Sequence, residues 1–83
     1  SGRIVYGRVK VDNGAKKALM NRSSLLSVGI TAVLRKFEKE DVFDIIDEEG
    51  WIFAVALAKT NSDVAISKEK KTIVAGADDI VLL

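Results

Sequence analysis

Apolar residues along most of this 83-residue chain recur at the short spacing of β-strands. Residues 8–11 read Arg-Val-Lys-Val, and such alternation is typical of a strand with one buried face. Val and Ile total 18 residues against 7 Leu, a composition that also favours strands. The predicted strands cover residues 4–11, 30–37, 42–46, 51–58, 72–74 and 80–82.

One segment shows a helical pattern instead. Three apolar residues recur at the spacing i, i+3 and i+4, which places them on one helical face: Ala15, Ala18 and Leu19. The pattern predicts a principal helix over residues 14–21. Asp12 or Asn13 is expected to cap it, because their side-chain oxygens can accept hydrogen bonds from the N–H groups of the first turn.

Shorter segments complete the prediction. Residues 23–27 indicate a turn or a single helical turn, residues 47–50 a hairpin loop, and residues 64–69 one further helical turn. The run 51–58 is almost wholly apolar and predicts a strand buried on both faces. The expected fold is therefore mainly β with one principal helix: about six short, mostly antiparallel strands wrapped into a small pseudo-barrel that the helix plugs.

The same periodicities predict the core. The residues expected to be mostly buried are Val9, Val11, Ala18, Leu19, Leu26, Ile30, Val33, Ile45, Ile52, Ala54, Ala56 and Val81.

Composition narrows the function classes. Cys and His are both absent, which excludes disulfides, zinc sites of the Cys/His type, cysteine nucleophiles and histidine-based catalysis. No phosphate-binding glycine loop or calcium-binding loop has the required spacing. We therefore expect no catalytic residues, no metal and no cofactor in this chain.

Length and the chain start suggest how the domain is organised. Eighty-three residues suffice for one domain with one small core. The chain has no initial Met, no signal peptide and no apolar run of about 20 residues. We expect a single domain over residues 1–83, cut from a longer cytoplasmic protein, with residues 1–7 as a linker or an added tail and no membrane partner.

Charge is distributed unevenly along the chain. Residues 1–37 carry eight basic and one acidic side chain, and residues 38–83 carry five basic and eleven acidic ones, which gives balances of +7 and −6. One interpretation is a mixed, solvated surface. The other is a basic face, built by the first half of the chain and suited to phosphates.

Several ordered motifs resemble the PUA domain, a fold named for pseudouridine synthases and archaeosine transglycosylases. They are V-D-N-G-A-K-K-A-L at residues 11–19, S-L-L-S-V-G-I at 24–30, F-x3-D-V at 37–42, D-x2-G-x-I-x-A at 47–54 and A-D-D-I-V-L-L at 77–83. More narrowly, the chain is similar to the C-terminal PUA domain of gamma-glutamyl kinase (glutamate 5-kinase).

The resemblance implies an RNA-contact region made of the first helix, the loop after it and the last strand. Structured RNA, such as tRNA or rRNA, would be the partner. The matching residues here are Lys16, Lys17, Asn21, Arg22, Ser23, Ser24, Ile80, Val81 and Leu82, and Gly29 would permit close approach of the backbone.

Some positions depart from the family pattern. Arg35, Glu40 and Ala56 stand where the family usually has glycine, and Val28 stands where it often has proline. The function of the glycine-containing turns is therefore open in this chain.

Two function classes remain. The first is an RNA-binding module. The second is a non-catalytic accessory domain of an amino-acid kinase resembling glutamate 5-kinase, which would act by packing against the catalytic domain of the same polypeptide or by assembly. A protein-interaction module built on a sheet edge is a third, less specific alternative.

Overall fold

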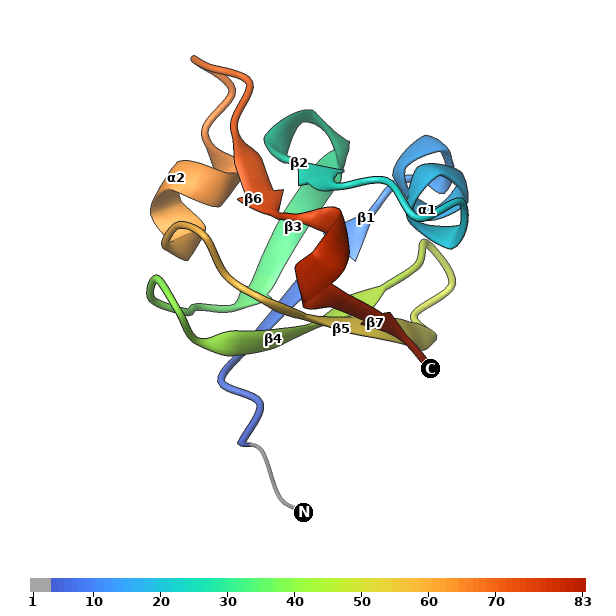
Figure 1. The fold of residues 1–83 in the computed structure, drawn as a ribbon. Helices are drawn as coiled ribbons and strands as arrows, with labels where there is room; N and C mark the ends of the chain where they lie inside the picture. Colours follow the sequence, from blue (N-terminus) through green and yellow to red (C-terminus); the bar gives the residue numbers. More distant parts are fainter. Residues whose placement is uncertain (1–3) are drawn as a thin grey trace.

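The computed structural model describes residues 4–83, and Ser1–Arg3 of the expected tail lie outside the described residues. Figure 1 shows the strands wrapping around a central core, with α1 at one side. The elements are β1 (Gly7–Val11), α1 (Asn13–Met20), β2 (Leu25–Leu26), η1 (Ser27–Gly29), β3 (Ile30–Arg35), β4 (Val42–Ile46), β5 (Ile52–Leu57), α2 (Ser62–Ile66), β6 (Ile73–Ala75), η2 (Ala77–Asp79) and β7 (Ile80–Leu82), where η marks a turn of 3-10 helix.

The strands form two sheets. The larger has five strands in the order β3-β1-β4-β5-β7, and the smaller pairs β2 with β6. Only β1 and β4 run parallel among the described strand pairs; the others are antiparallel. The mainly β fold with one principal helix is therefore confirmed.

The inner face of the larger sheet and α1 together enclose the core. Val9 and Ile45 are fully buried on this face, and Leu19, from α1, belongs to the same core cluster. The rings of Phe37 and Phe43 stack with centroids 4.5 Å apart. Gly7 leaves room for Phe37, because an added Cβ would lie only 2.4 Å from the Phe37 ring.

The sheet also includes part of segment 1–7. The Tyr6 N–H donates a hydrogen bond of 2.8 Å to the Val42 carbonyl, and Gly7 is the first residue of β1. No helix among residues 4–83 is long and apolar enough to cross a lipid bilayer.

Several element boundaries differ from the sequence pattern: β1 begins three residues later than predicted, and β3 ends two residues earlier. Strands β4 and β7 match the predicted 42–46 and 80–82. Residues 23–27, predicted as a turn, include β2, because Leu25 and Leu26 pair with β6 almost fifty residues later. The helical turn predicted at 64–69 begins earlier, at Ser62, since Asn61 caps it.

Ile52 was expected in the core, and that expectation is wrong: it is 42% exposed. The register between β4 and β5 shifts between Ile45 and Ile46, which face Ala54 and Ile52 respectively. Phe53 is thus an extra residue in the ladder. A β-bulge of this kind turns the side chain on its far side, here that of Ile52, to the opposite face of the sheet.

Val81 was also expected in the core and is 59% exposed. It lies opposite Val55 in the ladder, whereas Ile80 and Leu82 lie opposite the buried Ala56 and Ala54. Since paired side chains share a face, Val81 points away from the core. For the same reason β5 is not buried on both faces: its burial alternates along the strand.

Candidate nucleic-acid interface

Helix α1 carries two of the predicted RNA-contact residues, Lys16 and Lys17, and the loop after it carries four more, residues 21–24. Asp12 is its cap: the Asp12 carboxylate accepts a 2.7 Å hydrogen bond from the Ala15 N–H, and Asn13 is the first helical residue. The Asn13 N–H donates to a carboxylate oxygen of Glu48 at 2.9 Å. Two carboxylates at the positive end of the helix dipole thus stabilise its first turn.

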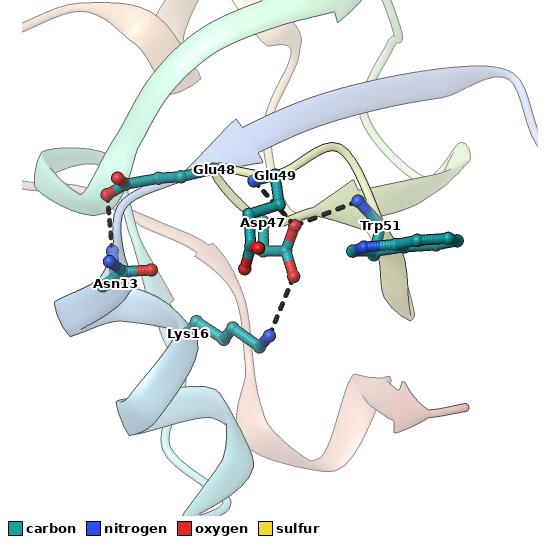
Figure 2. A network of polar contacts seen from close by, with 6 residues as sticks. All are labelled: Asn13, Lys16, Asp47, Glu48, Glu49 and Trp51. Carbon is teal, nitrogen blue, oxygen red and sulfur yellow. Dashed lines mark hydrogen bonds and ion pairs between the residues drawn. The ribbon is translucent and has the colours of Figure 1, made fainter.

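Lys16 is held by the hairpin loop between β4 and β5 (Figure 2). Its ammonium lies 2.8 Å from Asp47 Oδ2. The ammonium also lies 5.3 Å from the centre of the Phe53 ring. Asp47 is only 2% exposed, and its other oxygen accepts hydrogen bonds from the N–H groups of Glu49 and Trp51. The charge of Lys16 is therefore largely balanced within the domain.

The surroundings of Asp47 act on its pKa. The hydrogen bond from Lys16 and the N–H of Trp51 lower the pKa of Asp47 below its ordinary value, because both stabilise the charged form. Asp47 is therefore ionised at neutral pH, which keeps the ion pair with Lys16 in place.

Lys17 and Arg22 are exposed and lie at the other end of α1. The Arg22 N–H donates to the Leu19 carbonyl and the Ser23 N–H to the Ala18 carbonyl. These are the two hydrogen bonds of a Schellman motif, which usually has glycine where this chain has Arg22. Arg22 has a φ of 66°, so the chain holds a cationic residue in a strained conformation beside the loop.

A small hollow lies between α1 and the β2–η1 segment. Its volume is about 200 Å³, and its lining residues are Asp12, Ala15, Ala18, Ser24, Leu25, Leu26, Val28 and Gly29. An added Cβ at Gly29 would lie 2.6 Å from the Cβ of Ala15. Gly29 therefore lets η1 approach the helix, which closes one side of the hollow.

The remaining predicted residues are distributed over two sides of the molecule. Asn21 and Ser23 are exposed beside Arg22, and the hydroxyl of Ser24 accepts the Ala77 N–H at 3.2 Å. In β7, Ile80 is buried and Leu82 half-buried on the core side, whereas Val81 lies on the outer face of the sheet. The structure thus brings Lys17 and residues 21–23 together, and it separates Val81 from them.

Asp47 and Glu48 were not predicted from the sequence as partners of α1. Residues 47–50 were predicted only as a hairpin loop, and their contacts to Asn13 and Lys16 span more than thirty residues. The one signal in the sequence was the motif D-x2-G, in which an Asp side chain can bond the backbone of its own turn.

A sequence model of the PUA domain matches residues 7–77. The chain belongs to the PUA domain family. This PUA domain is 30% identical to glutamate 5-kinase from Sphingopyxis alaskensis over 99% of its own length, which is 26% of that relative. It is 38% identical to glutamate 5-kinase from Zymomonas mobilis over 76% of its length, 16% of that relative. The chain thus spans about a quarter or less of these relatives.

Solved structures share the fold. The archaeal box H/ACA sRNP Nop10–Cbf5 complex includes a chain that superposes with a TM-score of 0.79 at 18% identity, covering 94% of this PUA domain and 24% of that chain. A PUA domain from Aeropyrum pernix, crystallised with tartrate, gives a TM-score of 0.77 at 24% identity and covers 86% and 41% respectively. The resemblance to the PUA fold and to the C-terminal domain of glutamate 5-kinase is therefore confirmed.

Proposed function

We propose that this PUA domain binds structured RNA through the C-terminal end of α1 and the loop after it. The observation that carries the proposal is the Schellman motif closed by Arg22, where the backbone is held at a φ of 66°. Non-glycine residues in this conformation cost about 1–3 kcal/mol and often mark functional sites. Arg22 and Lys17 are both exposed, and both can contact phosphates.

The residues that line the hollow favour contacts with the RNA backbone rather than stacking on RNA bases. None of the residues that line it is aromatic, whereas proteins that bind single strands stack bases on aromatic rings. Shape and phosphate contacts are the usual way in which proteins recognise paired RNA.

The test is the salt dependence of binding to a structured, tRNA-like RNA. Removing one cation that neutralises a phosphate should lower the slope of log K against log salt by roughly 0.7–0.9. We expect Lys17→Ala and Arg22→Gly each to lower it by about this amount. Arg22→Gly also suits the Schellman turn, so weaker binding could not be ascribed to unfolding.

Two further variants make the experiment specific. Lys16→Ala should change the slope less than Lys17→Ala, because Lys16 is paired with Asp47. Lys39→Ala, in the exposed turn before β4, should leave the slope unchanged. An absence of binding at about 50 mM salt, where charge contacts are strong, would contradict the proposal.

A second candidate function is an accessory domain of a kinase. The observation in its favour is that a glutamate 5-kinase matches nearly the whole of this chain. In that case the domain would pack against a catalytic domain in the same polypeptide. The sequence encoded before residue 1 tests this directly: an amino-acid-kinase domain there supports it, and an RNA-modifying domain contradicts it.

A further inference from the structure

The outer face of the five-stranded sheet carries apolar side chains that the core does not use. The residues in one row across the strands are Arg35, Arg8, Asp44, Val55 and Val81, taken from β3 to β7 by the register of each pair. Val81 is 59% exposed and Val55 is half-buried. Exposed apolar residues gathered on one face often mark an interaction surface.

This face is hollowed at its β7 side. The hollow has a volume of about 340 Å³, and its lining residues are Val42, Val55, Ala56, Leu57, Asp78, Asp79 and Val81. Five of these seven residues are apolar, and the other two, Asp78 and Asp79, carry carboxylates. A fitting occupant would therefore present an apolar side chain flanked by cations.

The opposite edge of the same sheet has those features. Leu34, in β3, is 53% exposed, and Arg35 and Lys36 follow it. The register places Arg35 opposite Arg8 and Val33 opposite Val9, so Leu34 is an extra residue at a bulge. The sheet thus carries an apolar, basic segment at one edge and an apolar, acidic hollow at the other.

A two-fold axis parallel to the strands would bring these two edges together. Such a rotation turns one sheet onto another and places the β3 edge of each copy over the β7 edge of its partner. In a two-fold dimer every contact occurs twice, so a self-complementary face is what the symmetry requires. Two sheets packed in this way would also align their strands, as in β-sandwiches.

We propose that two copies of this PUA domain associate through the outer face of the five-stranded sheet. Leu34 of each copy enters the hollow of the other, and Arg35 pairs with Asp78 and Asp79 there. This surface is separate from the α1 end proposed for RNA, because the outer face is directed away from the core against which α1 packs. The contact is small for a protein interface, so we expect a weak dimer.

The test is the molar mass of the chain by sedimentation and light scattering, from about 10 µM to about 1 mM, the range of weak association. We expect the mass to rise from 9.0 kDa towards twice that value. Val81→Lys should raise the dissociation constant at least about tenfold, because it places a cation beside Arg35 of the partner copy. Val64→Lys, at an exposed position on α2, should leave it unchanged.

Charge exchange tests the pairing itself. Asp78→Lys with Asp79→Lys should weaken the dimer, as should Arg35→Glu alone. All three changes in one chain should restore it, since the charges are complementary again. Circular dichroism checks that each variant is folded. A monomer over the whole range, or a dimer equally sensitive to Val64→Lys, would overturn the proposal.

Discussion

Two residues hold backbone conformations that glycine adopts more readily. Arg22 has a φ of 66° and Glu40 a φ of 74°. Arg22 follows the end of α1, and its strained conformation places a cation at the proposed binding surface. Glu40 lies in the exposed turn between β3 and β4, where the PUA pattern has glycine, and the Glu40 N–H donates to the Ala58 carbonyl. This hydrogen bond stabilises the turn, whereas the Glu40 side chain only adds strain to it.

Glu40→Gly should therefore stabilise the domain. Glycine relieves the left-handed conformation, which raises the free energy of unfolding by about 1 kcal/mol. Part of this gain is lost, because glycine also makes the unfolded chain more flexible. The neighbouring Lys39→Gly is the control, because φ at Lys39 is not positive, and it should destabilise the domain. Urea unfolding measures both; a lower stability for Glu40→Gly would show that its turn is not strained.

At the level of elements, the bulge in β5 decides which side chains reach the core. Ala54 lies opposite the buried Ile45 and Ile52 lies opposite Ile46, so Phe53 is an extra residue between them. The alternation along 51–58 therefore breaks at the start of the strand. The hairpin loop that begins beside this bulge carries Asp47 to the side of α1, where Asp47 contacts Lys16.

The two isoleucines of this ladder should respond differently to truncation. Ile45→Ala removes a fully buried side chain and should lower the free energy of unfolding by about 2–5 kcal/mol. Ile52→Ala, at a position 42% exposed, should cost less than about 1 kcal/mol, since it leaves no enclosed cavity. Chemical denaturation of both variants measures the difference, and an equal destabilisation by the two would contradict the register described here.

For the whole molecule, the basic first half and the acidic second half of the chain bind each other. The ion pairs found among residues 4–83 are Arg8–Asp44, Lys16–Asp47 and Lys36–Asp63, and each joins the two halves. Arg8 contacts Asp44 through two hydrogen bonds, of 2.7 and 3.0 Å. Three of the eight basic side chains of residues 1–37 are therefore paired with the acidic second half.

This pairing predicts how stability depends on pH. The pKa of Asp47 is lower in the folded domain than its ordinary value, so its contribution is present above about pH 4 and disappears as the pH falls through the folded pKa. We expect the free energy of unfolding to be nearly constant from about pH 7 to 5 and to fall below about pH 4. Urea unfolding over that range measures it.

Asp47→Asn should flatten part of the acid dependence, because its amide oxygen can still accept the two backbone N–H groups but carries no charge for Lys16. Asp63→Asn is the matched control: its side chain is 81% exposed and 3.9 Å from Lys36. Exposed pairs contribute little, so this variant should retain the acid dependence of the parent. An Asp47→Asn variant with an unchanged profile would contradict the role assigned to Asp47.

Features that depend on neighbours in the chain were predictable from the sequence. A cap at Asp12 or Asn13, the helix after it and the spans of β4 and β7 all follow from local side-chain chemistry and periodicity, and the PUA motifs implied a small pseudo-barrel of mostly antiparallel strands. Buried positions such as Val9 and Ile45 were predicted for the same reason, because a regular ladder alternates its faces.

Features that depend on contacts between distant residues required the tertiary structure. A bulge shifts the register by one residue without a mark in the apolar pattern, so Ile52 was placed on the wrong face. The exposure of Val81 is set by the pairing of β7 with β5. The three residues of β7 do not by themselves show which side chain faces the core. Lys16 was expected to be free to contact phosphate, yet its partner Asp47 lies 31 residues away along the chain, and only folding brings the two charges within 2.8 Å.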